Sequence, residues 1–180
     1  MNILKKPRQG GFTIVELLIV IVVIGILAAI VLNTFVGAQE RAAATTIADG
    51  IKKAEKSLKT MAIDTGAATW WEDTTLTGSG NPRLSNIPGF NRYMNDFPAP
   101  AIAGSSGIIW RYDNDVDTYN GCSTDSDGVN VYITNFTNAS VAAHVDRIID
   151  DNNTACGRLR YHPVAQQILY LLDTDQNTDL

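Results

Sequence analysis

The sequence predicts an α+β fold in which a long N-terminal helix packs against a small antiparallel sheet. Residues 12–32 form a nearly uninterrupted apolar run, whose helix would rise about 30 Å and cross the hydrocarbon core of a bilayer. Apolar residues then recur at helical spacing as far as Met61. Between residues 108 and 172, four short segments have the composition of strands, which suits a small sheet that the helix covers.

Residues 1–11 are predicted to be a leader that the mature protein lacks. They are basic, which favours a cytoplasmic N-terminus and an exported C-terminal part. The residues alone leave open a plain signal anchor or a secretory signal peptide. However, a secretory signal has its small-residue cleavage site after the apolar run, whereas Gly10 and Gly11 stand before it. A cut after Gly11 would leave the apolar segment on the mature chain.

Glu16 is the one carboxylate within the apolar run. A carboxylate near the centre of a membrane helix costs on the order of 3 kcal/mol, so such a group is a functional candidate. No Lys or Arg lies between Arg8 and Arg41 to pair with it. Cleavage after Gly11 would create a cation one helical turn away, the new α-ammonium of Phe12. In an assembly the ammonium of a neighbouring chain would serve equally well.

The basic leader, the Gly11-Phe12 junction, Thr13, Glu16 and the aliphatic run to Ile30 together resemble the signal of type IV prepilins and type II secretion pseudopilins. The resemblance covers roughly residues 5–35. It implies that a prepilin peptidase cleaves after Gly11 and N-methylates Phe12. It also implies an ATP-driven assembly platform, and that Glu16 neutralises the Phe12 amine of an adjacent subunit. The sequence departs from the pattern at Asn33, where many members carry a helix-kinking proline.

One helix is predicted from Phe12 to about residue 63. Its first part, residues 12–33, would span the membrane and later form the filament core, and residues 34–63 would be amphipathic. The stripe that faces the head is predicted to consist of Ile47, Ile51, Ala54, Leu58 and Met61. Gly66 is the expected cap.

Residues 64–180 are predicted to form a globular head like that of a pilin. Residues 64–107 show no regular period, and their aromatic side chains either tie this segment to the helix or form an exposed recognition surface. A short helix is expected at residues 139–150 with Asn138 as its N-cap. Its apolar face would consist of Val141, Val145, Ile148 and Ile149. The predicted strands are residues 108–112, 129–136, 159–161 and 168–172.

The two cysteines, Cys122 and Cys156, both fall in the exported part. An oxidising compartment favours a disulfide between them, and many type IV pilins resemble this chain in stapling the C-terminal region with one disulfide. It would close a loop of roughly 35 residues and contribute about 3–4 kcal/mol in the chain-entropy model. The alternative is a pair of buried thiols.

Two acidic turns are candidate cation sites, because alternating aspartates supply the oxygen ligands that calcium prefers. The candidate ligands are Asp113, Asp115 and Asp117 in the first turn and Asp125 and Asp127 in the second. The first turn begins like an EF-hand loop but lacks its glycine and its final glutamate. Solvated turns are therefore the favoured interpretation, and no cofactor is expected.

The sequence contains no catalytic motif, and His144 and His162 lie far apart in it, so we expect a protein that is not an enzyme. A formal charge of −5 gives no footprint for general nucleic-acid binding. The favoured function is a structural subunit of a type IV pilus-like filament. It would be held in the cytoplasmic membrane with its head outside, and then assembled with other pilin subunits into an extracellular filament. The alternatives are a type II secretion pseudopilin and, from another class, a membrane-anchored binding domain that does not polymerise.

Overall fold

The structure is a computed structural model that describes residues 11–66, 82–105, 107–113 and 129–173. The chain divides into two compact units, Met1–Gln39 and Glu40–Leu180. The helix α1 (Ile14–Thr65) contributes its first residues to one unit and its remainder to the other. The second unit contains every strand of the described residues and is called the head below.

Within the head, α1 buries the stripe that the sequence predicts. Ile47, Ile51 and Ala54 are fully buried, and Leu58 and Met61 nearly so. Three small residues of the same face are also buried, namely Ala43, Ala44 and Ala48. The helix ends at Thr65, where Gly66 adopts a left-handed conformation and donates its N–H to the carbonyl oxygen of Ile63 at 3.1 Å. The predicted stripe and cap are therefore confirmed.

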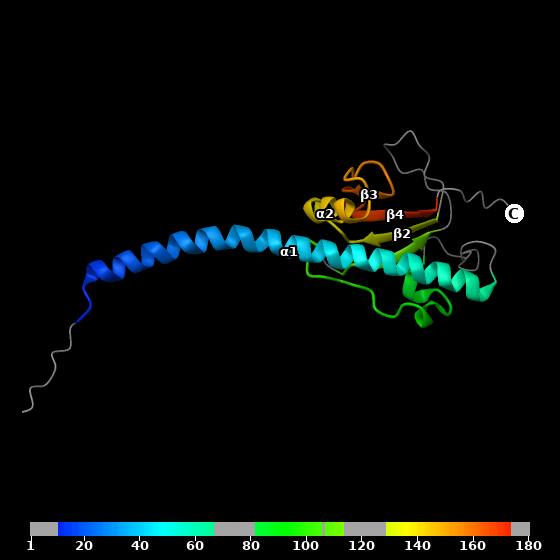
Figure 1. Cartoon of the computed structure of the whole chain (residues 1–180), viewed down its shortest axis with the longest axis horizontal. Helices are drawn as coiled ribbons and strands as arrows, with labels where there is room; N and C mark the ends of the chain where they lie inside the picture. The colour runs from blue at the N-terminus through cyan, green and yellow to red at the C-terminus, as the bar shows by residue number, and fades with distance from the viewer. Residues whose placement is uncertain (1–10, 67–81, 106, 114–128, 174–180) are drawn as a thin grey trace, which may run out of the picture. The chain divides into compact units, whose positions relative to one another are not determined.

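Four antiparallel strands form the sheet in the order β1-β2-β4-β3. They are β1 (Ile109–Asp113), β2 (Val129–Thr134), β3 (Leu159–His162) and β4 (Gln167–Asp173). The two central strands run side by side above α1 in Figure 1. The exposed edge of β1 is partly covered, because the N–H of Tyr112 donates to the carbonyl oxygen of Pro82 at 3.0 Å. All four strands lie where the sequence predicts them, within two residues at each end.

The inward face of the sheet and α1 share one apolar core. Alternate residues of the paired strands meet on this face, for example Trp110 with Ile133, and Val131 with Tyr170. The outward face is not fully solvated, since Tyr132, Leu169 and Leu171 form a second buried cluster there. The alternating residues Val129, Val131 and Ile133 of β2 face the common core, while Tyr132 on the opposite face is buried as well.

The helix α2 (Ala139–Ile149) follows β2 and adds Val141, Ala142 and Val145 to the core. Asn138 caps it as predicted, because its Oδ1 accepts a hydrogen bond from the N–H of Val141 at 2.9 Å. One predicted core residue is wrong: Ile148 is 44% exposed. The helix presents a different face to the sheet, and that face includes Asp146.

Residues 82–105 contain two 3₁₀ turns, Leu84–Asn86 and Phe90–Arg92, in the segment for which the sequence shows no period. Leu84 and Phe90 are fully buried in the common core, and Phe97 packs against Phe90 with ring centroids 6.3 Å apart. The interpretation that aromatic side chains tie this segment down is confirmed for Phe90. Trp70 and Trp71, which the same interpretation invoked, lie outside the described residues.

Gly50 lies beneath the indole of Trp110, and we expect Gly50→Ala to destabilise the head. A Cβ at this position would stand 2.7 Å from Cη2 of Trp110, whose Nε1–H donates to the carbonyl oxygen of Pro98 at 2.8 Å. The overpacking cost of about 1–3 kcal/mol outweighs the helical preference for alanine of about 1 kcal/mol. Urea denaturation followed by tryptophan fluorescence checks the result. Gly37→Ala is the matched control, because no atom of the described residues lies within 4 Å of the added methyl group.

Candidate functional site

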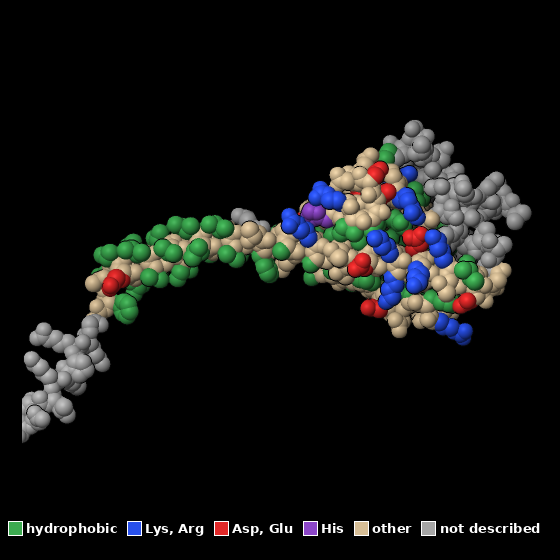
Figure 2. All heavy atoms as spheres, in the orientation of Figure 1, with side chains coloured by type: hydrophobic (Ala, Val, Ile, Leu, Met, Phe, Trp, Pro, Cys, Tyr) green, Lys and Arg blue, Asp and Glu red, His purple; other side chains and the backbone are tan. Residues whose placement is uncertain are grey.

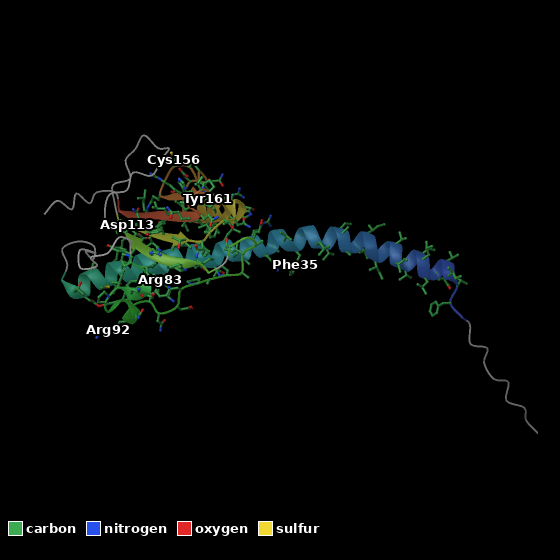
Figure 3. All side chains as sticks on the ribbon, turned by 180° about the vertical axis from the view of Figure 1, so that it is seen from behind. Phe35, Arg83, Arg92, Asp113, Cys156 and Tyr161 are labelled. Carbon is green, nitrogen blue, oxygen red and sulfur yellow. The ribbon has the colours of Figure 1, made fainter. Side chains whose placement is uncertain are left out.

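The first part of α1 is apolar on every side. All the large hydrophobic side chains between Phe12 and Val36 are exposed in the single chain, with exposed fractions from 48% to 90%. Figure 2 shows hydrophobic side chains along the whole of this segment, which includes Phe35, labelled in Figure 3. By length and composition, α1 is able to cross a membrane, and it is the one such helix in the described part of the chain. So large an apolar surface requires either lipid or protein to cover it.

Glu16 folds back onto the start of α1. Its Oε2 accepts hydrogen bonds from the backbone N–H of Thr13 at 2.8 Å and from the Thr13 hydroxyl at 2.9 Å. The Oγ1 of Thr13 in turn accepts the N–H of Glu16 at 3.3 Å. This reciprocal arrangement is a capping box, in which the N-cap residue and the third helical residue satisfy each other's free N–H groups. It fixes the carboxylate at the N-terminal end of the apolar segment.

The predicted cleavage junction lies immediately before this box. Gly11 is exposed and Phe12 is 90% exposed, so the peptide between them is accessible in the single chain. A new amino group on Phe12 would lie within one helical turn of Glu16. The carboxylate has a second oxygen, Oε1, for which no partner is found among the described residues. The arrangement therefore keeps a negative charge available at the helix end while its other oxygen is already bound.

The capping box is a feature that the sequence analysis missed. The signal was present, because Thr-x-x-Glu before an apolar run is the sequence pattern of this motif. A search for a cation that pairs with Glu16 overlooks this pattern, because the partner is the uncharged Thr13 three residues earlier. Glu16 therefore has a local structural role in addition to the predicted role in assembly, which stays a prediction.

Of the other predicted site residues, the structure describes Cys156 and Asp113. Cys156 lies in the turn before β3, and its N–H donates to the carbonyl oxygen of Asn153 at 2.9 Å (Figure 3). Cys122 lies outside the described residues, so the disulfide stays a prediction. Asp113 ends β1 and is buried. The remaining candidate ligands lie outside the described residues, namely Asp115, Asp117, Asp125 and Asp127.

A different acidic cluster lies at the C-terminal end of α2. Asp146, Asp150 and Asp151 each direct one carboxylate oxygen to a common region, and these oxygens lie within 4.8 Å of one another. Burial, with the charges of Asp150 and Asp151 nearby, raises the pKa of Asp146 to about 6. The sequence does not single out these residues, because polar residues near a helix end ordinarily face solvent.

Comparisons with known proteins agree with the geometry of the first unit. Residues 6–32 match the family described as the prokaryotic N-terminal methylation motif. The chain is 36% identical over 61 residues to the type II secretion system core protein G of Aeromonas hydrophila, a match that covers 34% of this chain and 43% of that protein. It is 31% identical over 120 residues to the type IV major fimbrial protein FimA of Dichelobacter nodosus, covering 64% of this chain and 69% of that protein. No solved structure matches.

These similarities coincide with the structural features described above. The methylation motif ends within the exposed apolar segment of α1 and includes Gly11, Phe12 and Glu16. The match to the fimbrial protein is more than twice as long as the motif and extends the likeness well beyond the signal. A long N-terminal helix with a small antiparallel sheet is the layout that a pilin has. The chain belongs to the family of type IV pilins and type II secretion pseudopilins.

Proposed function

We propose that this protein is the structural subunit of a type IV pilus-like filament, assembled through the first part of α1. The observation that carries the proposal is the continuous exposed apolar surface from Phe12 to Val36, most of which lies within the methylation motif at residues 6–32. Before assembly this segment crosses the cytoplasmic membrane once, with the N-terminus in the cytoplasm and the head outside. After assembly the segments of many subunits pack side by side in the filament core.

The same apolar surface serves in two environments. Lipid tails are about as apolar as a bundle of helices, so burial alone scarcely favours the move from membrane to filament. A machine that uses ATP must therefore extract the subunit, and a specific contact must set its position in the core. The carboxylate of Glu16 supplies that contact, because an unpaired charge in a dry core is costly.

We propose further that a prepilin peptidase cleaves after Gly11 and methylates the new amine of Phe12. The ammonium of one subunit then pairs with Glu16 of the adjacent subunit. The capping box supports this assignment, since it holds the carboxylate in one place at the helix end before a partner arrives. A preorganised group loses less conformational entropy when it binds.

Within the family, the length of the similarity favours a pilin over a pseudopilin. The match to the fimbrial protein covers 64% of this chain, whereas the match to the secretion protein covers 34%. If the chain is a pilin, long fibres that contain it should be present on the cell surface. If it is a pseudopilin, the structure that contains it should be short and confined to the periplasm. Immunogold electron microscopy of intact cells with antibody against the head separates the two.

Mass spectrometry of the intact protein, purified from its native membrane, tests the proposal most directly. Removal of residues 1–11 and methylation of Phe12 give a mature chain that begins at N-methyl-Phe12. A membrane-anchored domain that never polymerises would keep its basic leader. An uncleaved chain therefore refutes the assembly proposal, whereas a cleaved chain without fibres on the cell points to the pseudopilin.

A further inference from the structure

The C-terminal end of α2 contains a buried carboxylate, that of Asp146, without a hydrogen-bond partner among the described residues. Asp146 is fully buried, and both of its oxygens lack such a partner. A buried carboxylate without partners is costly, and in native proteins such a group is usually paired or bound to a metal ion. Lys, Arg and His side chains of the described chain form no ion pair with it. A ligand that is positively charged would complete this site.

Two further carboxylates point to the same place. Asp150 is half-buried and Asp151 is exposed, and one oxygen of each lies within 4.8 Å of an oxygen of Asp146. Calcium binds oxygen at 2.3–2.6 Å, so two ligands of one ion stand at most about 5 Å apart. The spacing of the three oxygens therefore fits a single shared ion.

The local backbone holds two of these carboxylates in position. Asp150 accepts the N–H of Leu159, the first residue of β3, at 2.7 Å, and Asp151 accepts the N–H of Asn153 at 2.9 Å. Gly157 leaves room for them, because a Cβ there would stand 2.5 Å from the Oδ2 of Asp150. The site therefore joins the end of α2 to the start of β3.

The charge of the cluster also fits a divalent ion. Three carboxylates contribute −3, and the guanidinium of Arg160, which interacts electrostatically with Asp150, contributes +1. The remaining charge of −2 equals the charge that one divalent cation neutralises. All the candidate ligands are oxygens, which disfavours zinc, and exposed Asp151 leaves space for water to complete a coordination of six to eight.

We infer that Asp146, Asp150 and Asp151 form a calcium site that ties the end of α2 to β3 in the head. These three ligands are different residues from the candidate ligands that the sequence suggests at residues 113–117 and 125–127. In the extracellular medium, where calcium is abundant, the ion would stabilise the head of an exposed filament subunit. Without calcium, Asp146 remains buried beside two like charges.

Thermal unfolding of the full chain in detergent micelles at neutral pH tests this inference. We expect about 1 mM calcium, the level at which extracellular modules bind, to raise the Tm of the wild type by about 4 °C relative to chelator. Magnesium at the same concentration should give a clearly smaller shift. Asp151→Asn should remove most of the calcium shift, and because Asp151 is exposed this variant should fold normally. Asp49 is an exposed acid on a different helix, α1, and Asp49→Asn should therefore keep the full calcium-dependent rise in Tm.

Calorimetric titration with calcium supplies an independent readout. Asp151→Asn and Asp146→Asn should each bind one calcium ion fewer than the wild type. An equal calcium shift in the wild type and in Asp151→Asn would overturn the inference, since the ion would then bind elsewhere. A wild type that does not respond to calcium, together with an Asp146→Asn variant that is more stable in chelator, would also overturn it. That result would identify Asp146 as a carboxyl group that stays protonated.

Discussion

Glu16→Ala is expected to leave a cleaved, membrane-inserted protein that forms at least about tenfold fewer filaments than the wild type. Filaments are lost because, without Glu16, the Phe12 ammonium of the adjacent subunit would be buried in the dry core without a counter-charge. Leaving one member of a buried ion pair alone costs about 3–5 kcal/mol, and each 1.4 kcal/mol corresponds to a factor of ten. Sheared filaments and membrane fractions are compared by immunoblot, and mass spectrometry confirms that Phe12 is the first residue.

The capping box provides the matched controls for this prediction. Glu16→Gln keeps an oxygen that can accept the hydrogen bonds from Thr13 but removes the charge. Thr13→Ala keeps the charge but removes the hydroxyl group of the box. If the carboxylate acts by pairing with an amine, Glu16→Gln fails like Glu16→Ala and Thr13→Ala still assembles.

The opposite pattern would assign Glu16 to helix capping alone. In that case Glu16→Gln would assemble at wild-type levels, and Thr13→Ala would lose filaments. Normal filament yield from Glu16→Ala itself would exclude both roles. The three variants therefore separate the charge of Glu16 from its hydrogen bonds.

The sequence predicts an element correctly where its apolar residues recur at a regular spacing and only one of its faces is buried. The stripe from Ile47 to Met61 is predicted correctly because a helix against a sheet buries a single face. The order of the strands, β1-β2-β4-β3, depends on how the chain connects them in space. The local sequence of a strand contains no information about which strand will be its neighbour. The second cluster around Tyr132 was missed because alternation reports only which residues share a face. The predicted burial of Ile148 is wrong because α2 turns Asp146, and not Ile148, toward the core.

The candidate sites show the same limit. Glu16 stands out in the sequence because a charge among aliphatic residues has no ordinary explanation. Asp146 does not stand out, because an aspartate in an amphipathic helix normally faces water. Its burial depends on how α2 meets β3, and its neighbours Asp150 and Asp151 gather only through the turn that follows. A site made by tertiary packing is visible only once the packing is known.

Ile51→Ala is expected to cost the head about 4 kcal/mol of unfolding free energy. Ile51 is fully buried in the stripe of α1, within the core that this helix shares with the sheet. Truncation removes the transfer energy of the side chain and leaves a cavity, and such changes cost about 2–5 kcal/mol in a packed core. Urea denaturation of the full chain in detergent micelles measures the change, with the fluorescence of buried Trp110 reporting on the core.

Ile63→Ala is the matched control, because it makes the same change in the same helix at a side chain that is 78% exposed. We expect it to change stability by less than about 0.5 kcal/mol, as surface substitutions usually do. The difference between the two variants mainly reports the contribution of packing, because both replace isoleucine with alanine within α1. Equal effects would mean that the second part of α1 does not pack on the sheet, and the head would then need another explanation for its stability.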